Sequence, residues 1–209
     1  MTDMNEIQEV LLSGDSDKLN EIVKTALTED IKAADILNNG LISGMDIIGE
    51  KMKNGDMFIP EVLMAARAMG LAIEILQPLL GEDDKAAKGK VLIGTVKGDL
   101  HDIGKNLVTM MLESAGLAVI DLGVDVSSET FIKAIEEEKP DVLAMSALLT
   151  TTMPMMQETV NAISESGIRK QVKIIVGGAP VTQKFADEIG VDGYAPDAGS
   201  ASQLVKSYC

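Results

Sequence analysis

The sequence has 209 residues, with 18 basic and 33 acidic side chains, and a formal net charge of −15 at pH 7. This charge would repel phosphate backbones, and with only 2% aromatic residues few rings are available to stack on bases, so nucleic acid is not an expected partner. Apolar stretches end well before the roughly 18 residues of a membrane span. The only cysteine is Cys209, and the acidic N-terminus does not resemble a secretion signal, so we expect a cytoplasmic protein.

The first 80 residues are predicted to form helices, because apolar residues recur there at intervals of three and four. The polar signal Asn38-Asn39-Gly40 is expected to form a turn between two of them. Pro60 fits the first turn of the last helix, where its missing N–H costs nothing. Four helices with short connections predict a small bundle, which we place in residues 1–88. The expected helices run from Asp15 or Ser16 to Leu27 and over 31–37, 41–52 and 60–80.

The polar stretch 81–89 is bounded by glycines and is predicted to be a linker, after which strand and helix patterns alternate. Uninterrupted apolar runs such as 142–145 are typical of a sheet that is covered on both faces. Residues 89–209 are therefore expected to form an α/β domain with a flavodoxin-like, doubly wound, five-stranded parallel sheet. Strands are expected at 90–96, 117–122, 141–147, 172–176 and 192–195, and helices near 104–115, 128–138, 153–166, 181–189 and 198–207.

The only histidine of the chain, His101, comes directly after the first expected strand, in Asp99-Leu100-His101-Asp102-Ile103-Gly104. Open α/β sheets bind ligands just beyond the carboxyl ends of their strands. A carboxylate two residues before the imidazole can orient the ring as a metal ligand, and Gly104 allows a bulky group to approach the backbone. One histidine and a terminal cysteine cannot supply a zinc site. The pattern therefore favours a single axial ligand to a metal that is held mainly by a large cofactor.

Two later segments are expected at the same edge of the sheet. The segment 146–152 follows the third strand and offers hydroxyl groups beside a small residue, and 176–180 follows the fourth strand with little side-chain bulk. Together they could form a slot for a long arm of the cofactor. Simpler explanations stand beside this one, because Gly177-Gly178 also suits a strand-end turn with positive φ and a lone histidine is often structural.

The pattern Asp-x-His-x-x-Gly resembles the signature of methyltransferase corrinoid proteins, and the chain is also similar to the cobalamin-binding module of methionine synthase. The resemblance extends through 49–61, Ser146-Ala147-Leu148, the glycine pair and 192–198. It implies that His101 is the axial cobalt ligand of a cobalamin whose benzimidazole arm is displaced. It further implies that Asp99 orients His101, that Ser146 extends this network, and that the glycine pair lines the benzimidazole slot. The residues expected to contact cobalamin are Asp99, His101, Asp102, Ile103, Gly104, Ser146, Leu148, Thr150, Gly177 and Gly178.

The resemblance also implies a function. The chain would be a non-catalytic subunit that carries a methyl group on cobalt from a substrate-specific methyltransferase to a second methyltransferase, with a reductive activator as a further possible partner. The helical segment would act as a cap. The alternatives are the cobalamin-binding subunit of an adenosylcobalamin-dependent mutase, a cobalamin-dependent sensor and a flavodoxin-like receiver. The helical segment disfavours the mutase, no output module is apparent for a sensor, and the first strand does not end in a phosphorylation site.

Overall fold

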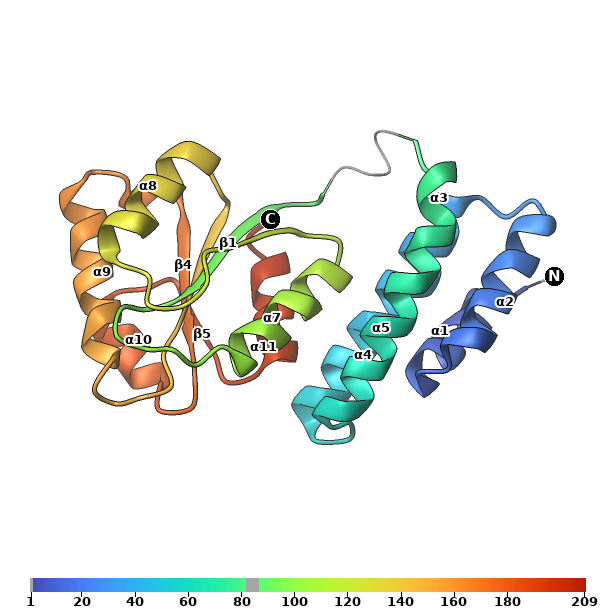
Figure 1. The fold of residues 1–209 in the computed structure, drawn as a ribbon, viewed down its shortest axis with the longest axis horizontal. Coiled ribbons are helices and arrows are strands. Elements are labelled where there is room, and N and C mark those ends of the chain that lie inside the picture. Colours follow the sequence, from blue (N-terminus) through green and yellow to red (C-terminus); the bar gives the residue numbers. More distant parts are fainter. Residues whose placement is uncertain (1, 82–86) are drawn as a thin grey trace. The chain divides into compact units, whose positions relative to one another are not determined.

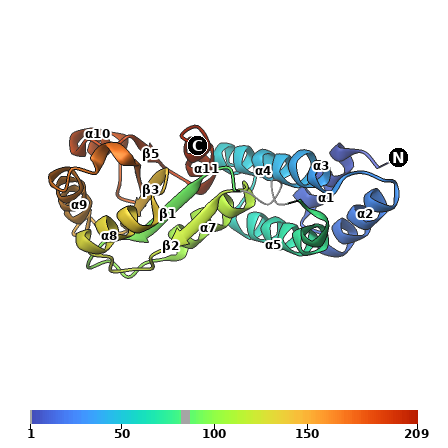
Figure 2. The ribbon, with the colours of Figure 1, turned by 90° about the horizontal axis from the view of Figure 1, so that it is seen from above.

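A computed structural model of the chain describes residues 2–81 and 87–209, so most of the predicted linker at 81–89 lies outside the described residues. The chain divides into two compact units, one helical and one α/β (Figures 1 and 2). The helical unit comprises Met1–Ala87 together with Ser114–Gly116, and the α/β unit comprises Lys88–Glu113 and Leu117–Cys209.

The helical unit is the predicted bundle, but its first helix was not predicted. That helix begins at Asp3, whose side chain accepts the Asn5 N–H at 3.1 Å, and ends at Gly14, whose φ is 70°. It is only 10 residues long, so it offers little more than one apolar stripe as a signal in the sequence. The helices within residues 2–81 are α1 (Met4–Ser13), α2 (Ser16–Thr28), α3 (Ala33–Asp35), the π-helix η1 (Ile36–Ile42), α4 (Ser43–Asn54), α5 (Ile59–Leu76) and the 3₁₀-helix η2 (Gln77–Leu79).

The predicted turn at 38–40 is wrong, because α3, η1 and α4 follow one another without a break. The wider π-helical turn leaves the Asn39 carbonyl to accept a hydrogen bond from the Gln8 side chain at 2.7 Å. A Cβ atom on Gly40 would lie 3.0 Å from Ile7 of α1. The glycine therefore serves close helix packing here, and the pair of asparagines does not end the helix.

The last long helix, α5, matches the helix predicted over 60–80, although its final residues belong to η2. Pro60 lies in its first turn, and the Glu61 side chain accepts the Phe58 N–H at 2.8 Å. One side of α5 is buried in the bundle, whereas Leu63 and Met64 are exposed. None of the helices in the described part of the chain is both long and apolar enough to cross a membrane.

The α/β unit contains the predicted five-stranded sheet, in the order β2-β1-β3-β4-β5 with every neighbouring pair parallel. This confirms the flavodoxin-like prediction. Its strands are β1 (Lys90–Thr95), β2 (Ala118–Asp121), β3 (Val142–Ser146), β4 (Lys173–Gly177) and β5 (Gly193–Ala195), and its helices are α7 (Ile103–Ser114), α8 (Ser128–Glu138), α9 (Met153–Glu165), the 3₁₀-helix η3 (Arg169–Gln171), α10 (Gln183–Ile189) and α11 (Ala198–Lys206).

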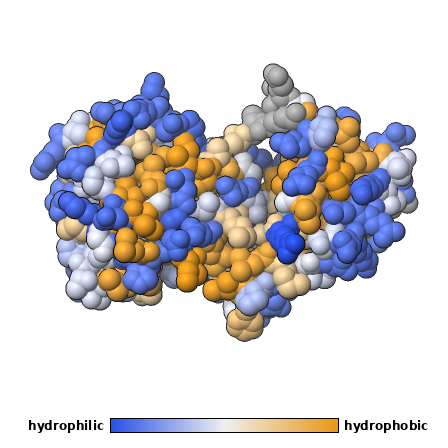
Figure 3. Space-filling model, viewed as in Figure 1, coloured by the Kyte–Doolittle hydropathy of each residue, from blue (hydrophilic) through white to orange (hydrophobic). Residues whose placement is uncertain are grey.

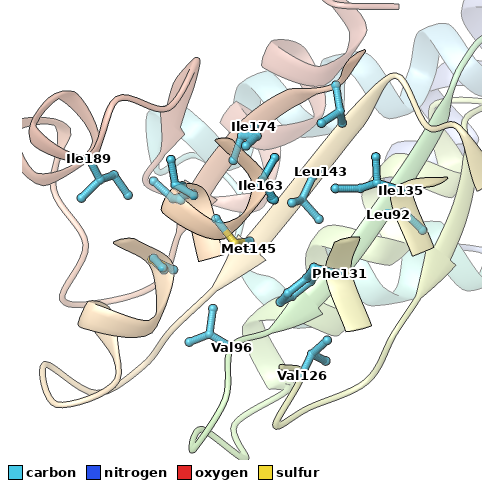
Figure 4. Close-up of a cluster of buried hydrophobic side chains, with 14 of the residues drawn as sticks. Leu92, Val96, Val126, Phe131, Ile135, Leu143, Met145, Ile163, Ile174 and Ile189 are labelled. Carbon is cyan, nitrogen blue, oxygen red and sulfur yellow. The ribbon is translucent and has the colours of Figure 1, made fainter. Parts of the chain in front are cut away.

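Both faces of this sheet are covered by helices. Helices α8, α9 and α10 lie on one side, and α7 and α11 lie on the other (Figure 1). The core under the first group contains Phe131 of α8 and Ile163 of α9, packed against Leu143 and Ile174 of the central strands (Figure 4). Burial on both faces explains why the central strands are continuous apolar runs.

The strand order reverses between β1 and β3, which both begin their outward connections at the carboxyl edge of the sheet. In doubly wound sheets this point is where ligands bind. Small residues pair in register across the last row of this edge: Thr95 with Ser146, Ser146 with Gly177, and Gly177 with Ala195. The fold therefore brings the loop after β1 and the loop after β3 together, beside a row of strand ends with little side-chain bulk.

Candidate functional site

The loop between β1 and α7 holds His101 against Asp99. The Nδ1 atom of His101 lies 2.7 Å from Oδ1 of Asp99, and the His101 backbone N–H donates to the same oxygen at 3.1 Å. The buried hydroxyl of Thr95 donates to the His101 carbonyl at 2.9 Å. Both the ring and the backbone of His101 are thus fixed by the end of the first strand and its loop.

The second oxygen of Asp99 is bound by the loop between β3 and α9. Its Oδ2 atom accepts the Leu148 N–H at 2.7 Å, the Leu149 N–H at 3.3 Å and the Thr152 hydroxyl at 2.7 Å. Asp99 is 0% exposed to solvent. Burial alone would raise its pKa, but the hydrogen bonds from Thr152, Leu148 and His101 outweigh burial and hold the pKa of Asp99 well below its usual range. Asp99 is therefore a buried carboxylate that stays ionised at neutral pH.

The Asp99 carboxylate determines which ring nitrogen of His101 carries a proton. An ionised carboxylate can only accept hydrogen bonds, so the 2.7 Å contact requires the proton on Nδ1 of His101. In the neutral ring Nε2 then carries a lone pair and is directed away from Asp99. The His101 side chain is 51% exposed, so the ring is not enclosed by packing within the unit. A carboxylate that fixes the tautomer and the aim of a histidine is the usual support of a metal-binding imidazole.

Ser146 was predicted to extend this network from Asp99, but the structure does not show that contact. No hydrogen bond joins Ser146 to Asp99 in the described part of the chain, and the hydroxyl that reaches Asp99 is that of Thr152. Ser146 ends β3 in the middle of the sheet, whereas Thr152 lies at the start of α9, after the loop has turned back toward β1. Thr150-Thr151-Thr152 precedes a helix with an early proline. A hydroxyl residue at the start of a helix was the sequence signal that could have pointed to Thr152.

Apolar side chains with exposed surface come from the two loops that hold Asp99 and His101. Leu100 and Ile103 flank His101 in sequence and are 71% and 83% exposed, and Leu148 and Leu149 are also exposed. Figure 3 shows hydrophobic residues reaching the surface on the face in view. A Cβ atom on Gly104 would meet no atom within 4 Å, so the backbone there borders open space. Exposed apolar groups around one oriented polar atom are typical of a ligand surface.

The remaining predicted residues differ in how tightly the fold holds them. Asp102 and Thr150 are exposed, and the Asp102 carbonyl accepts the Asn106 N–H at the start of α7. A Cβ atom on Gly177 would lie 2.9 Å from the Ala195 carbonyl oxygen, and one on Gly178 would lie 1.9 Å from that of Ala147. Gly178 also has a φ of 123°. Both glycines are thus required by close approach of the backbones at the strand ends.

A buried lysine near the site was not singled out from the sequence. The Lys105 ammonium is 2% exposed, forms an ion pair with Asp121 at the end of β2, and donates to the Asn106 side chain at 2.8 Å. Burial and the nearby Asp121 raise the pKa of Glu113, which lies farther along the same helix. The Lys105–Asp121 pair joins the first turn of α7 to β2, so it fixes the helix that follows His101.

The donor groups of this site suit a metal that brings most of its own ligands. Among the residues that the structure describes, no group of three or more His, Cys, Asp or Glu side chains could hold a metal ion. The site itself offers one imidazole nitrogen, surrounded by apolar groups. A metal held in a macrocycle needs only an axial ligand from the protein and an apolar surface against the ring. These residues therefore fit such a cofactor.

Comparison with protein families gives matches for both units. A family model described as a B12 binding domain matches residues 89–202, and a second model with the same description matches residues 4–77. Together these two models span most of the helical unit and most of the α/β unit.

Individual proteins match along nearly the whole chain. A corrinoid protein of Desulfitobacterium hafniense (strain Y51) is 40% identical over 98% of this chain and 96% of its own length. A trimethylamine corrinoid protein of Methanosarcina barkeri is 42% identical over 96% of this chain and 93% of its own length.

Solved structures with a similar fold include a cobalamin-binding protein from Desulfitobacterium hafniense DCB-2, with a TM-score of 0.87 and 30% identity over 100% of both chains. A second is a chain of the methanol:cobalamin methyltransferase complex MtaBC from Methanosarcina barkeri, with a TM-score of 0.81 and 33% identity over 96% of this chain and 77% of that one. Two family models and close relatives of nearly equal length agree with the resemblance of the His101 signature. The chain belongs to the family of cobalamin-binding corrinoid proteins.

Proposed function

We propose that this chain carries a methyl group between two methyltransferases on the cobalt of a bound cobalamin, with Nε2 of His101 as the axial protein ligand. The observation that supports this most is the contact of His101 Nδ1 with a fully buried carboxylate, which leaves Nε2 as the ring nitrogen not bound by Asp99. When bound, cobalamin supplies a cobalt centre that can accept and release a methyl group. The protein supplies position, shielding and control of one proton.

The two loops would bind the cofactor from the α/β unit. The exposed Leu100 and Ile103 would contact the corrin ring, and the open space at Gly104 would allow the ring to approach the backbone. Leu148, Thr150 and Asp102 would contact the ring edge. A macrocycle surface is largely apolar, so exposed aliphatic groups are suited to it.

The displaced benzimidazole arm would enter the α/β unit at the carboxyl edge of the sheet. Ser146 and Gly177 occupy the last paired row there, between Thr95 and Ala195, and none of the four has a bulky side chain. Gly178 keeps β4 and the Ala147 backbone close together, so substitution there would displace the wall of this slot. These features support a base-off cofactor, in which His101 replaces the benzimidazole as ligand.

The hydrogen-bonded set His101, Asp99 and Thr152 would also handle a proton during methyl transfer. If His101 released a bound metal, its Nε2 would be free to accept a proton. The resulting positive charge would then lie next to the ionised Asp99, whose negative charge is held by Thr152 and Leu148. Asp99 would in this way stabilise a proton on His101 beside the cofactor.

Residues 1–88 would form the cap domain and 89–209 the cobalamin domain of this carrier. The exposed apolar residues of the helical unit include Phe58, which precedes α5, and Met64 within it. The partners would be a substrate-specific methyltransferase and a second methyltransferase, with a reductive activator for oxidised cobalt. The carrier itself would recognise neither methyl donor nor final acceptor, which would make it a non-enzymatic subunit.

A reconstitution experiment tests this function. The chain is loaded with hydroxocobalamin, reduced, and mixed separately with trimethylamine, dimethylamine or methanol and the matching corrinoid methyltransferase. The expected result is one corrinoid per chain that acquires a labelled methyl group from one of these donors, and passes it on to a second methyltransferase. The matched control is His101→Ala. Failure of every methyltransferase to methylate the loaded chain, combined with substrate-dependent radical formation when it holds adenosylcobalamin, would favour a mutase subunit instead.

A further inference from the structure

The segment between β2 and α8 runs beside the loop that carries His101. The Thr95 N–H donates to the Gly123 carbonyl at 3.0 Å, and the Val126 N–H donates to the Thr95 carbonyl at 3.0 Å. Val96 and Val126 also pair as an isolated parallel bridge. Residues 122–126 therefore extend the sheet beyond the end of β1, at the point where the His101 loop begins.

Within this segment, Asp125 makes two hydrogen bonds to the His101 loop. Its Oδ1 atom accepts the Gly98 N–H at 2.7 Å, and its backbone N–H donates to the Asp99 carbonyl at 3.0 Å. Asp125 adopts a φ of 55°, a left-handed conformation that residues with a Cβ atom rarely adopt. In the described part of the chain, Asp30 and Lys139 are the other non-glycine residues with positive φ.

Asp125 is exposed, so packing in a core does not account for its conformation. Backbone conformations of this kind persist only where the surroundings fix them, and they gather at functional sites. Here the surroundings are Gly98 and Asp99, in the loop that carries His101. Asp99 is thus held from two directions: its carboxylate by the loop after β3, and its backbone carbonyl by Asp125.

We propose that Asp125 is a positioning residue for the axial ligand: through Gly98 and Asp99 it sets the direction in which Nε2 of His101 points. This inference rests on the proposed role of His101 as the cobalt ligand. Asp125 does not touch the imidazole and acts only through the loop. Its side chain accepts the Gly98 N–H, and its backbone conformation directs its own N–H toward the Asp99 carbonyl. The two contributions can be separated by substitution.

Three variants separate the hydrogen bond from the backbone conformation. Asp125→Asn keeps an acceptor for Gly98 and is a residue that tolerates positive φ. Asp125→Gly removes the acceptor but adopts positive φ without strain. Asp125→Ala removes the acceptor and also disfavours the conformation. Asp30→Ala is the matched control, because Asp30 has a φ of 62° in the helical unit, outside the proposed site.

Two measurements are made on each variant. In the cobalamin-free chain, the ¹⁵N chemical shifts of the imidazole, recorded at one fixed pH, report which ring nitrogen is protonated. His101 is the only histidine, so these signals need no assignment. In the chain loaded with methylcobalamin, the visible spectrum gives the ratio of histidine-ligated to unligated cofactor. The wild-type chain and His101→Ala, recorded first, test the proposed function itself.

We expect Asp125→Asn and Asp30→Ala to match the wild type in both measurements. Asp125→Gly should lower the ratio of ligated to unligated cofactor by about threefold, the effect of one modest hydrogen bond, and should reduce the share of the Nδ1-protonated tautomer. Asp125→Ala should lower both by more, because it also disfavours the backbone conformation. Wild-type behaviour of Asp125→Gly would overturn the proposal, as would an equal change in Asp30→Ala. If the wild-type spectrum itself does not depend on His101, the proposed function fails. The tautomer measurement then still decides whether Asp125 positions the ring.

Discussion

Two aspartates at opposite edges of the same sheet, Asp192 partly buried and Asp99 fully buried, have a lowered pKa for different reasons. At the amino edge, Asp192 accepts hydrogen bonds from Arg169 at 2.9 Å, Lys173 at 3.0 Å and the Ile174 N–H at 2.9 Å. At the carboxyl edge, Asp99 accepts from three backbone amides, a hydroxyl and an imidazole, and no Lys or Arg pairs with it in the described chain.

Asp192 therefore carries a charge that is cancelled inside the protein, whereas the charge of Asp99 is balanced only by dipoles and by whatever His101 binds. Asp192 joins β4, β5 and the segment after α11, because its carbonyl also accepts the Tyr208 hydroxyl at 2.7 Å. Each of its partners has a structural role. A buried carboxylate without a cationic partner is costly, and such sites are retained where the charge serves a ligand. We therefore expect Asp192, at the amino edge, to contribute to stability, and Asp99, at the carboxyl edge, to serve function.

The largest effect on folding is expected from Gly178→Ala, at the carboxyl edge. The new Cβ atom would lie 1.9 Å from the Ala147 carbonyl oxygen, at a φ of 123°. Backbone cannot yield as a side chain can, so we expect a loss of more than about 3 kcal/mol of unfolding free energy, or failure to fold. Gly104→Ala is the matched variant, because its Cβ meets nothing within 4 Å. Urea unfolding should leave Gly104→Ala unchanged in stability, and reduced cobalamin affinity of that variant would place the corrin ring against it.

The next largest effects separate the two aspartates directly. Asp99→Ala removes the group that orients His101, and loss of such support typically weakens metal binding by about 10- to 100-fold. Asp192→Ala leaves Arg169 and Lys173 without their shared carboxylate and should lower the unfolding free energy while the spectrum of bound cobalamin stays that of the wild type. Equal loss of His101 ligation in both variants, measured by cobalamin titration, would remove the distinction between the two edges.

A smaller effect is expected from Thr152→Val, which removes the hydroxyl bonded to Asp99 while keeping the shape of the side chain. One buried hydrogen bond to a charged group contributes about 1.5 to 3 kcal/mol, so both stability and the share of ligated cofactor should fall. Thr152→Ser should restore most of the loss. Ser146→Ala tests the role first predicted for that residue, and a larger effect on ligation from Ser146→Ala than from Thr152→Val would contradict the observed network.

The smallest effect is expected on the unfolding free energy at low pH. The pKa values of Asp99 and Asp192 are both lowered in the folded chain, so each ionised carboxylate stabilises the fold above the ordinary aspartate pKa of about 4. This stability is lost as the pH falls below that value toward the folded pKa. The unfolding free energy is measured with urea between about pH 3 and pH 7, where carboxylates titrate. It should fall less steeply toward acid in Asp192→Asn than in the wild type. If the unfolding free energy of the variant falls toward acid as steeply as that of the wild type, Asp192 does not cause this loss of stability.

Much of the fold could be predicted because the α/β unit has strong periodic signals. The continuous apolar runs of β1, β3 and β4 require a covered parallel sheet, and their observed bounds lie within one or two residues of the predicted ones. The helical unit was harder. The pair Asn38-Asn39 indicates a turn locally, but contacts of Asn39 and Gly40 with α1 outweigh that preference. Local sequence cannot reveal a π-helix that tertiary packing stabilises.

The site was predictable to the extent that it is local. Asp99 and His101 are two residues apart, so their contact could be anticipated from spacing and from the strand end that precedes them. Thr152 is 53 residues from Asp99 in sequence, and only the turn of the loop after β3 decides that its hydroxyl, rather than that of Ser146, reaches the carboxylate. Asp125 is likewise placed by a bridge between distant segments.

The bond between His101 and cobalt is tested most directly by electron paramagnetic resonance of the chain loaded with cobalamin in its cobalt(II) state. The chain is prepared once with unlabelled histidine and once with histidine carrying ¹⁵N in the ring, which labels His101 alone. Coordination by Nε2 of His101 predicts that the axial nitrogen splitting changes from a triplet to a doublet with the labelled chain. A triplet that persists would mean that the benzimidazole of the cofactor is still the ligand, and would contradict the proposed role of His101.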